Sequence, residues 1–196
     1  MNSSSFAPSS SSLKIYVGLV HAPVVNKRGD QVITSITNLD IHDIARSCRT
    51  FGVEKFFLIN PLHAQQTLAN RILTYWQQDQ GNAYNPDRSD ALRKVAWAFT
   101  IEEAVEDIKA SENTPPAIVV TSAQFAENTI LAADLAHKVG EKPVLLLFGT
   151  GWGLAPSVSE KATWRLQPIT YPASGYNHLS VRSAVAIYLD RIRQGR

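Results

Sequence analysis

The sequence is poor in three features that often define a class of protein: cysteine, charge of one sign and long apolar runs. Cys48 is the single cysteine among 196 residues, which excludes an intramolecular disulfide and indicates a reducing compartment. No apolar run approaches the roughly 18 residues of a membrane helix. The formal net charge of +2 permits a nucleic-acid partner without requiring one. We therefore expect a cytoplasmic protein with no membrane partner. We also expect no metal site, because the sequence has no cluster of histidines and cysteines.

The chain begins with a serine-rich stretch that lacks the basic start and apolar core of a signal peptide. Its composition predicts a disordered lead over residues 1–12. The chain is 44% hydrophobic, which is enough to bury one good core. Residues 13–196 are accordingly expected to form a single domain.

Short apolar, β-branched runs alternate with helical patterns along the chain. Most of these runs are continuously apolar, as expected for strands that are buried on both faces. Strands are predicted at 14–20, 55–60, 95–100, 117–122 and 143–149, and helices at 40–51, 62–78, 102–110 and 128–139. This alternation predicts an α/β fold, a parallel sheet with helices on both faces.

The stretch from residue 177 onward predicts a C-terminal helix with Asn177 as its capping residue. Apolar residues recur at helical spacing on one side, and the other side is apolar too. These residues are Val181, Ala184, Val185, Tyr188 and Ile192, then Leu179, Ala186 and Leu189. A helix that is apolar nearly all round predicts packing on two sides, against the sheet and against a partner subunit.

The segment LLLFGTGWGLAP, residues 145–156, ends an apolar run in Gly149, Gly151 and Gly153. A phosphate-binding P-loop requires a lysine and a hydroxyl residue after its last glycine, where this chain has Leu154 and an alanine. A dinucleotide fingerprint requires a glycine at the position of Leu154, in the first strand–helix turn of the fold. Neither nucleotide motif fits, and a tight turn with positive φ remains as an alternative.

The predicted helix at 40–51 carries Asp43, Arg46 and Arg49 opposite its apolar stripe. Their spacing alone indicates a solvated face with local ion pairs, each worth about 0.2–0.5 kcal/mol. The stretch 24–34 predicts an exposed loop that bears basic residues.

Three segments in the same order resemble the SPOUT class of RNA methyltransferases. They are an arginine shortly before FGV (51–53), a Gly-x-Gly turn after a late strand (149–151), and the segment NHLSVRSAVAIYL (177–189). The chain is most similar to a bacterial branch with NKRG and TNLDIHDIAR near the start and FGTGWGL near the end. The resemblance covers about residues 14 to 193.

The resemblance implies a C-terminal trefoil knot, one of the few exceptions to the rule against knotted chains. The knot would be built from the strands at 117–122 and 143–149, the segment 165–172 and the final helix. It also implies a homodimer that binds S-adenosylmethionine within the knot and methylates tRNA or rRNA. By position, the cofactor site would consist of Thr121, Ser122, Phe148, Gly149, Thr150, Gly151, Leu166, Pro168, Ile169, Asn177, Leu179 and Ser180. Gly149 and Gly151 would let the main chain approach the adenosine closely.

By similarity, Arg46 takes the place of the arginine that ribose-methylating members use near the target nucleotide, and it is the catalytic candidate. Those members usually have an asparagine six residues earlier, where this chain has Asp40. This departure leaves the acceptor atom open between a ribose 2′-oxygen and a base nitrogen. His42 or Asp43 is an alternative proton acceptor. Candidate RNA-binding residues are Lys27, Arg28, Arg46 and Arg49, whose charges would contact phosphates.

Three hypotheses remain at this point. The first is an S-adenosylmethionine-dependent RNA methyltransferase. The second is a catalytically silent SPOUT-fold protein that binds the cofactor or RNA, and Asp40 keeps it open. The third is an α/β nucleotide-binding enzyme, which the absent motifs disfavour. Trp152 has no assigned role in any of them.

Overall fold

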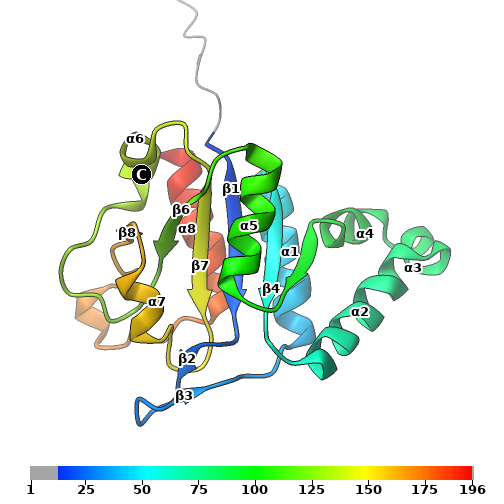
Figure 1. The fold of residues 1–196 in the computed structure, drawn as a ribbon, viewed down its shortest axis with the longest axis horizontal. Coiled ribbons are helices and arrows are strands. Elements are labelled where there is room, and N and C mark those ends of the chain that lie inside the picture. Colours follow the sequence, from blue (N-terminus) through cyan, green and yellow to red (C-terminus); the bar gives the residue numbers. More distant parts are fainter. Residues whose placement is uncertain (1–12, 196) are drawn as a thin grey trace, which may run out of the picture.

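The computed structural model describes residues 13–195, so the lead expected at 1–12 lies outside the described residues. Six parallel strands form one sheet in the order β5-β4-β1-β7-β6-β8 (Figure 1). They are β1 (Ile15–Val20), β4 (Lys55–Ile59), β5 (Val95–Ala98), β6 (Ala117–Val120), β7 (Val144–Gly149) and β8 (Trp164–Arg165). The parallel sheet predicted from the continuous apolar runs is confirmed.

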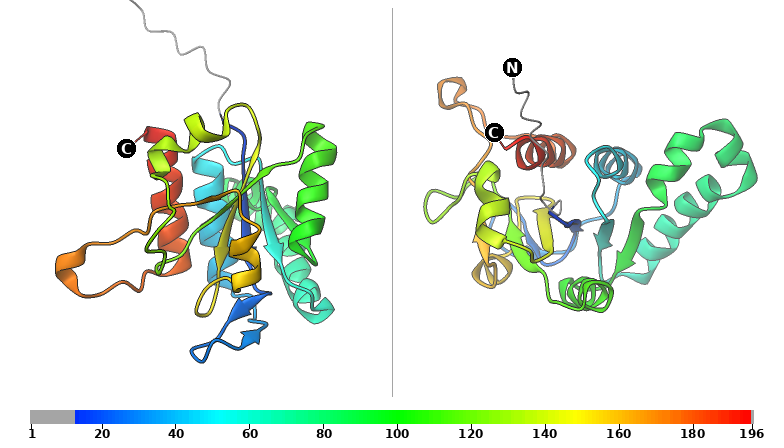
Figure 2. Two further views of the ribbon diagram at one scale, coloured as in Figure 1. Left: turned by 60° about the vertical axis from the view of Figure 1, so that its left-hand side comes forward. Right: turned by 90° about the horizontal axis from the view of Figure 1, so that it is seen from above.

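Helices cover both faces of this sheet (Figure 2). The main helices are α1 (Asn38–Thr50), α2 (His63–Gln77), α3 (Asp79–Tyr84), α4 (Pro86–Leu92), α5 (Ile101–Glu112), α6 (Leu135–Val139), α7 (Pro156–Glu160) and α8 (Val181–Gln194). One core cluster joins the sheet to α1, α4 and α8, and the other joins it to α5 and α7. Helices α2 to α4 extend beyond the β5 edge.

The central strand β1 is buried at every residue, because it pairs with β4 and β7 and has helices on both faces. Its glycine, Gly18, allows close packing within the sheet. A Cβ there would lie 2.7 Å from a methyl group of Leu147 and 3.0 Å from one of Ile59. These two neighbours belong to β7 and β4, so Gly18 is where the large residues of the flanking strands meet.

The helix predicted at 128–139 is shorter than expected. It begins with the 3-10 turn η1 (Ala132–Asp134), continues as α6 and ends at Gly140, whose φ is +61°. The preceding residues are extended because Ile130 bridges to the chain after β8. Its N–H donates to Arg165 O (2.9 Å), and its carbonyl accepts from the N–H of Gln167 (2.9 Å). This pairing could not be predicted from local propensity.

The capping prediction for the C-terminal helix was wrong. The N-cap of α8 is Ser180, whose hydroxyl oxygen accepts from the N–H of Ser183 (3.2 Å). The Asn177 side chain instead donates to Ala123 O (3.0 Å), three residues before the cap. Residues 177–179 thus form an extended approach to the helix, tied to the segment that follows β6.

The second apolar side of α8 has partners within the same chain. The helix packs against β7 on one side and against α1 and η1 on the others. The partner subunit that this pattern predicted is therefore not required to cover α8, and the homodimer stays a prediction.

The stretch expected to be a loop at 24–34 is a short hairpin of β2 (Val24–Val25) and β3 (Gln31–Val32). Two backbone bonds dock it onto the loop after β7. Val25 N–H donates to Gly153 O, and Trp152 N–H donates to Val25 O, both at 3.0 Å. Between residues 13 and 195, no helix combines the length and the apolar character needed to cross a membrane.

Arg193 fastens the end of α8 to the rest of the fold, which leads to a first prediction. Its guanidinium donates to the carbonyls of Leu13 (2.8 Å), Phe51 (2.8 Å) and Gly52 (2.9 Å). Arg193→Ala should lower the free energy of unfolding by about 3 kcal/mol, because loss of the charged donor leaves three backbone carbonyls without this hydrogen-bond partner. Urea denaturation measures this, with the exposed neighbour variant Gln194→Ala expected to change it by less than about 0.5 kcal/mol. Equal stability of the two variants would contradict the assignment.

Candidate active site

The strand order creates a topological switch point between β1 and β7. From β1 the chain proceeds through β4 to β5 on one side, whereas β7, β6 and β8 lie on the other side. In open parallel sheets, ligands bind beyond the carboxyl ends of the strands at such a point. A cavity of about 890 Å³ lies there, within the size range of small-molecule sites. We call it the switch-point cavity.

The walls of the switch-point cavity come from segments that are remote in sequence: the residues after β1, β6 and β7, the first turn of α1 and the approach to α8. Ten of the twelve predicted cofactor residues line it, namely Thr121, Ser122, Phe148, Gly149, Thr150, Gly151, Ile169, Asn177, Leu179 and Ser180. Gly153, His178 and Tyr188 join them.

Leu166 and Pro168 do not line the switch-point cavity, contrary to the sequence-based expectation. The N–H of Leu166 donates to Val120 O (3.0 Å), which continues the pairing of β8 with β6. Its side chain is fully buried in the core cluster that contains α8. The prediction placed the start of the cavity wall at Leu166, where the chain still pairs with β6. Of the three residues predicted in this segment, only Ile169 lines the switch-point cavity.

The glycines after β7 serve the loop's own geometry. A Cβ on Gly149 would lie 2.6 Å from Leu154 N and 2.8 Å from Gly153 C, so the loop closes on its own backbone there. Gly151 has a φ of +60°, and a Cβ on it would lie 3.1 Å from Val25 O of the docked hairpin. These two contacts explain the glycines without a ligand, and they hold the backbone that forms one cavity wall.

Several predicted cofactor contacts are already hydrogen-bonded within the protein. The Thr121 hydroxyl donates to Leu147 O (3.0 Å), and the Ser122 hydroxyl oxygen accepts from the N–H of Gln124 (3.0 Å). The Tyr188 hydroxyl donates to Gln167 O (2.8 Å), and burial raises its pKa to about 12. These side chains therefore shape the wall as neutral groups.

A buried relay that the sequence did not predict runs along one wall of the switch-point cavity. Thr150 donates its hydroxyl proton to Val20 O (3.0 Å), so Thr34 must donate to Thr150 (2.5 Å between hydroxyl oxygens). Thr34 then accepts from Nδ1–H of His21 (2.9 Å). This assigns the tautomer of His21, whose Nε2 becomes an acceptor that is buried and has no partner among the described residues.

Burial lowers the pKa of His21 to about 4, although the carboxylate of Asp40 opposes this effect. The imidazole is therefore neutral at physiological pH. A neutral ring with Nδ1 protonated can accept a hydrogen bond at Nε2 and can donate none there.

Asp40 connects the first turn of α1 to the first turn of α8. Its carboxylate accepts from the Thr37 hydroxyl (2.6 Å) and from the Arg182 guanidinium (2.8 Å). The same guanidinium lies 3.5 Å from the carboxylate of Asp43. The aspartate that departs from the family pattern thus has a structural partner. No sequence signal could pair it with Arg182, which lies 142 residues away.

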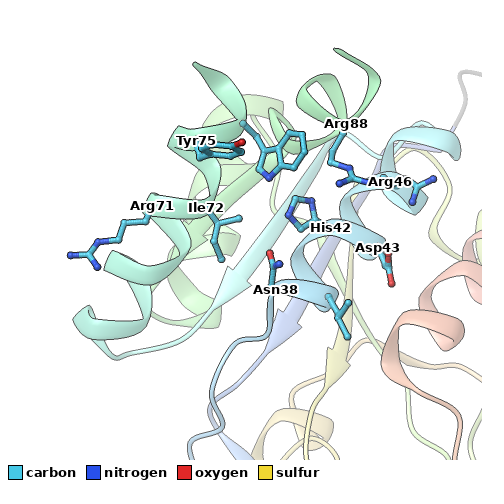
Figure 3. A pocket seen from close by; sticks show the side chains of 10 residues that line it. Asn38, His42, Asp43, Arg46, Arg71, Ile72, Tyr75 and Arg88 are labelled. Carbon is cyan, nitrogen blue, oxygen red and sulfur yellow. The ribbon is translucent and has the colours of Figure 1, made fainter. Parts of the chain in front are cut away.

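Arg46 does not line the switch-point cavity. It belongs to a second hollow of about 650 Å³, which we call the α1–α2 groove (Figure 3). The groove is lined by Asn38, Leu39, His42, Asp43, Arg46, Arg71, Ile72, Tyr75, Trp76 and Arg88. The alternative proton acceptors His42 and Asp43 also lie here, on α1, and not at the switch-point cavity.

The other basic candidates lie on separate elements. Lys27 and Arg28 are exposed on the β2–β3 hairpin, and the Lys27 ammonium lies 5.9 Å from the ring centroid of Trp152. Trp152 is 48% exposed, lines the switch-point cavity and meets the ring of His178 at 6.5 Å. Its position places an aromatic ring where the cavity opens toward the hairpin.

Arg49 pairs with Asp90 of α4, Nε to carboxylate at 2.5 Å. The local ion pairs predicted within α1 are therefore replaced by pairs with other elements, Arg49 with α4 and Asp43 with α8. Helix α1 is packed between α4 and α8. These helices bring an opposite charge to Arg49 and to Asp43 within ion-pair distance, whereas Asp43, Arg46 and Arg49 do not pair with one another.

The fold is that of the SPOUT class of methyltransferases. A probable methylase family protein from Haemophilus influenzae Rd KW20 superposes with a TM-score of 0.62 at 18% identity, covering 93% of this chain and 66% of that one. The TrmH/SpoU tRNA modifying enzyme of A. aeolicus gives a TM-score of 0.56 at 14% identity, covering 95% and 76%. The trefoil knot expected from the sequence is implied by this fold.

The chain belongs to a family described as SAM-dependent RNA methyltransferase, which matches residues 14–194. A tRNA (guanine-N(1)-)-methyltransferase from Oleidesulfovibrio alaskensis is 46% identical over 178 residues, 91% of this chain and 41% of that protein. An uncharacterized protein from Aquifex aeolicus is 36% identical over 180 residues, 91% of this chain and 87% of that protein. The chain thus spans less than half of the first relative.

The switch-point cavity suits S-adenosylmethionine. Ile169 and Leu179 supply apolar surface for an adenine ring, while the turn at 149–153 brings main-chain groups to the wall. The unpartnered Nε2 of His21 offers an acceptor in the same wall. Among the side chains that the structure describes, which exclude residue 79, no group of three or more His, Cys, Asp or Glu is arranged to hold a metal ion.

The buried, neutral His21 predicts a specific loss of stability in acid. Its native pKa of about 4 lies below the ordinary 6.5, so the unfolded chain binds the proton more readily. His21 should therefore cost the native state about 3 kcal/mol as the pH falls from 6.5 to 4. His21→Asn keeps a donor toward Thr34 and does not titrate, so this component should disappear.

Denaturant unfolding of both proteins at pH 7 and pH 4 measures the difference. The matched control is the exposed histidine variant His137→Asn, whose acid-induced loss should equal that of the wild type. If His21→Asn also loses as much stability in acid as the wild type, His21 is not the buried titrating group.

Proposed function

We propose that the protein is an S-adenosylmethionine-dependent RNA methyltransferase that acts on tRNA or rRNA in the cytoplasm. The observation that carries this proposal is the convergence at the switch-point cavity. Two of the three segments that carry the family resemblance, 149–151 and 177–189, line one cavity at the carboxyl edge of the sheet, together with Thr121 and Ser122 from the predicted cofactor site. A relative's name points toward tRNA, but 41% of its length is matched, so the RNA and the acceptor atom remain part of the proposal.

In this proposal the cofactor lies in the switch-point cavity and supplies an already activated methyl group. The chain has to exclude water, align the acceptor and provide for one proton. The apolar side chains of Ile169 and Leu179 would hold the adenine, and the hydrogen bonds that link Val20, Thr150, Thr34 and His21 would hold the His21 acceptor in place. Because the pKa of His21 is lowered by burial, its Nε2 would accept a hydrogen bond without competing protonation.

We further propose a homodimer in which Arg46 of one copy serves the switch-point cavity of the other. Arg46 does not line the cavity of its own chain, and its guanidinium forms no ion pair with any acidic side chain that the structure describes. A catalytic role for it therefore requires a second copy. The exposed Leu39, one turn from Asp43 on α1, offers apolar surface for such an interface.

The second candidate function is a SPOUT-fold protein that binds the cofactor or RNA without catalysis. It is favoured by one observation: Asp40, which stands where ribose-methylating members have an asparagine, is engaged within the chain by the Thr37 hydroxyl and the Arg182 guanidinium. Cofactor binding is common to both functions, whereas methyl transfer separates them.

The first test is calorimetry with S-adenosylmethionine and its demethylated product. The wild type should bind both, and Gly149→Ala should weaken binding about tenfold or more, because its Cβ would force the loop backbone apart. Gly140→Ala is the matched control. It places a methyl group on a glycine at the end of α6 whose φ is positive and whose added Cβ would have no neighbour within 4 Å. A wild type that binds neither ligand contradicts the proposed function.

The second test is transfer of a radiolabelled methyl group to bulk tRNA and rRNA. Arg46→Ala should reduce the rate about tenfold or more, since the arginine stabilises charge at the reacting centre. Arg93→Ala, an exposed arginine outside the α1–α2 groove, should not. Cofactor binding without transfer to any RNA would favour the second candidate.

Mixing the two inactive variants tests the dimer. Random reassociation of Arg46→Ala with Gly149→Ala should restore roughly a quarter of wild-type activity, since half of the dimers are mixed and each holds one intact site. Light scattering should give twice the chain mass. A monomer at micromolar concentration, or mixed variants without activity, contradicts the shared site.

A further inference from the structure

The α1–α2 groove gathers positive charge that the rest of the described chain does not neutralise. Arg46 of α1, Arg71 of α2 and Arg88 of α4 line it (Figure 3) and take part in no ion pair among the side chains that the structure describes. Asp43 is the single acid among the described lining residues, and it faces Arg182 at 3.5 Å. Arg46 and Arg88 lie toward one end of the groove and Arg71 points outward at the other end (Figure 3), so the groove carries positive charge at both ends.

Aromatic rings are interleaved with these arginines. The Arg88 guanidinium lies 4.8 Å from the ring centroid of Trp76, and the rings of His42 and Tyr75 meet Trp76 edge-on, each with a centroid distance of 5.5 Å. Trp76 is thus held by three neighbours and forms a fixed floor. Tyr75 is 55% exposed, so its ring is open to a planar ligand.

The pKa of His42 reports the local electrostatics. Burial of the ring is the largest cause of its lowered pKa, and the positive charge of Arg88 is the second. The charge of Arg46 lowers the pKa further, whereas the carboxylate of Asp43 raises it. Two arginines from different helices therefore act on one buried ring. The imidazole is neutral at pH 7, and its Nδ1 has no hydrogen-bond partner among the described residues.

The surface continues along α2 without an acid. A neighbouring hollow of about 400 Å³ shares Arg71 and Tyr75 with the groove and adds Thr67, Asn70, Thr74 and Gln78. Hydroxyl and amide side chains of this kind bond to phosphate and sugar oxygens as readily as arginines do. Because they share Arg71 and Tyr75, the groove and the hollow form one continuous strip.

The α1–α2 groove and the switch-point cavity share a wall. Thr37 and Asp40 line the cavity, whereas Asn38 and Leu39, between them in the same turn, line the groove. A polymer bound in the groove therefore passes beside the first turn of α1. This neighbourhood links the groove to the proposed methyl-transfer site.

We propose that the α1–α2 groove binds a single-stranded stretch of the substrate RNA outside the methylated nucleotide. The phosphates of this stretch contact Arg71 and Arg88, and one base stacks on Tyr75. An acidic peptide would match the charge, but it has no planar group for the exposed ring, whereas bases stack on aromatic side chains beside a basic track. This inference rests on the proposed function and adds where the RNA lies.

The test measures binding of fluorescein-labelled oligouridylate and of bulk tRNA to the full chain by fluorescence anisotropy. Tyr75→Ala should weaken oligouridylate binding roughly tenfold through lost stacking, and Tyr75→Phe, which keeps the ring, should bind like the wild type. Arg71→Ala should reduce the salt slope of log K by about 0.7, as expected for one phosphate contact to a single strand. In methyl transfer, both alanine variants should raise KM for RNA and leave kcat unchanged.

Lys142→Ala is the matched control. It removes an exposed charge from the turn before β7, at the amino end of the sheet, and should alter neither affinity nor salt slope. Equal binding by Tyr75→Ala, Arg71→Ala and Lys142→Ala would overturn the inference. The inference would also be overturned if polyglutamate displaced the RNA and if Tyr75→Ala and Tyr75→Phe bound oligouridylate equally well. That result would favour an acidic protein as the ligand.

The outcomes separate the inference from the proposed function. Calorimetry with S-adenosylmethionine should give the same affinity for every groove variant as for the wild type. If the wild type binds the cofactor and methylates RNA while the groove variants behave like Lys142→Ala, the groove inference alone is wrong. If the wild type binds no cofactor, the proposed function is wrong, whatever the groove does.

Discussion

The pairing of β1 with β7 brings the two ends of the functional site together, and most of what lies around the site depends on it. In this parallel register Val20 lies beside Gly149, so the residues that follow each strand emerge side by side. His21 and Thr150 are consequently within reach of one hydroxyl, that of Thr34. Six buried residues of β1 hold the register in place, since a parallel strand with helices on both faces cannot slip without exposing apolar side chains.

The loop after β7 is stabilised from two directions. Its own backbone closes at Gly149, and the β2–β3 hairpin holds it from outside through Val25. A wall built in this way is preorganised, because neither contact has to form when a ligand arrives. The Asp40–Arg182 pair does the same for the opposite side, where it joins the first turns of α1 and α8. The site is thus rigid at its rim before any cofactor or RNA is bound.

Much of the fold was predictable because its signals are local. Continuous apolar runs identified the five longer strands, and the stripe of α1 identified that helix within two residues at its start. What could not be predicted depends on distant partners. The extended residues before η1 exist because Ile130 pairs with the chain after β8, and Ser180 replaces Asn177 as a cap because Asn177 bonds to Ala123. The relay through Thr34 and Thr150 joins residues 116 positions apart, a distance over which composition carries no signal.

The three carbonyls held by Arg193 have a consequence for how the chain folds as it is made. Leu13, Phe51 and Gly52 are synthesised early, whereas their common donor is more than 140 residues later. Until α8 has left the ribosome, the start of β1 and the end of α1 lack this clamp, and the core cluster that α8 completes is open on one side. The apolar residues that α8 covers can therefore be fully buried only once nearly the whole chain has been made.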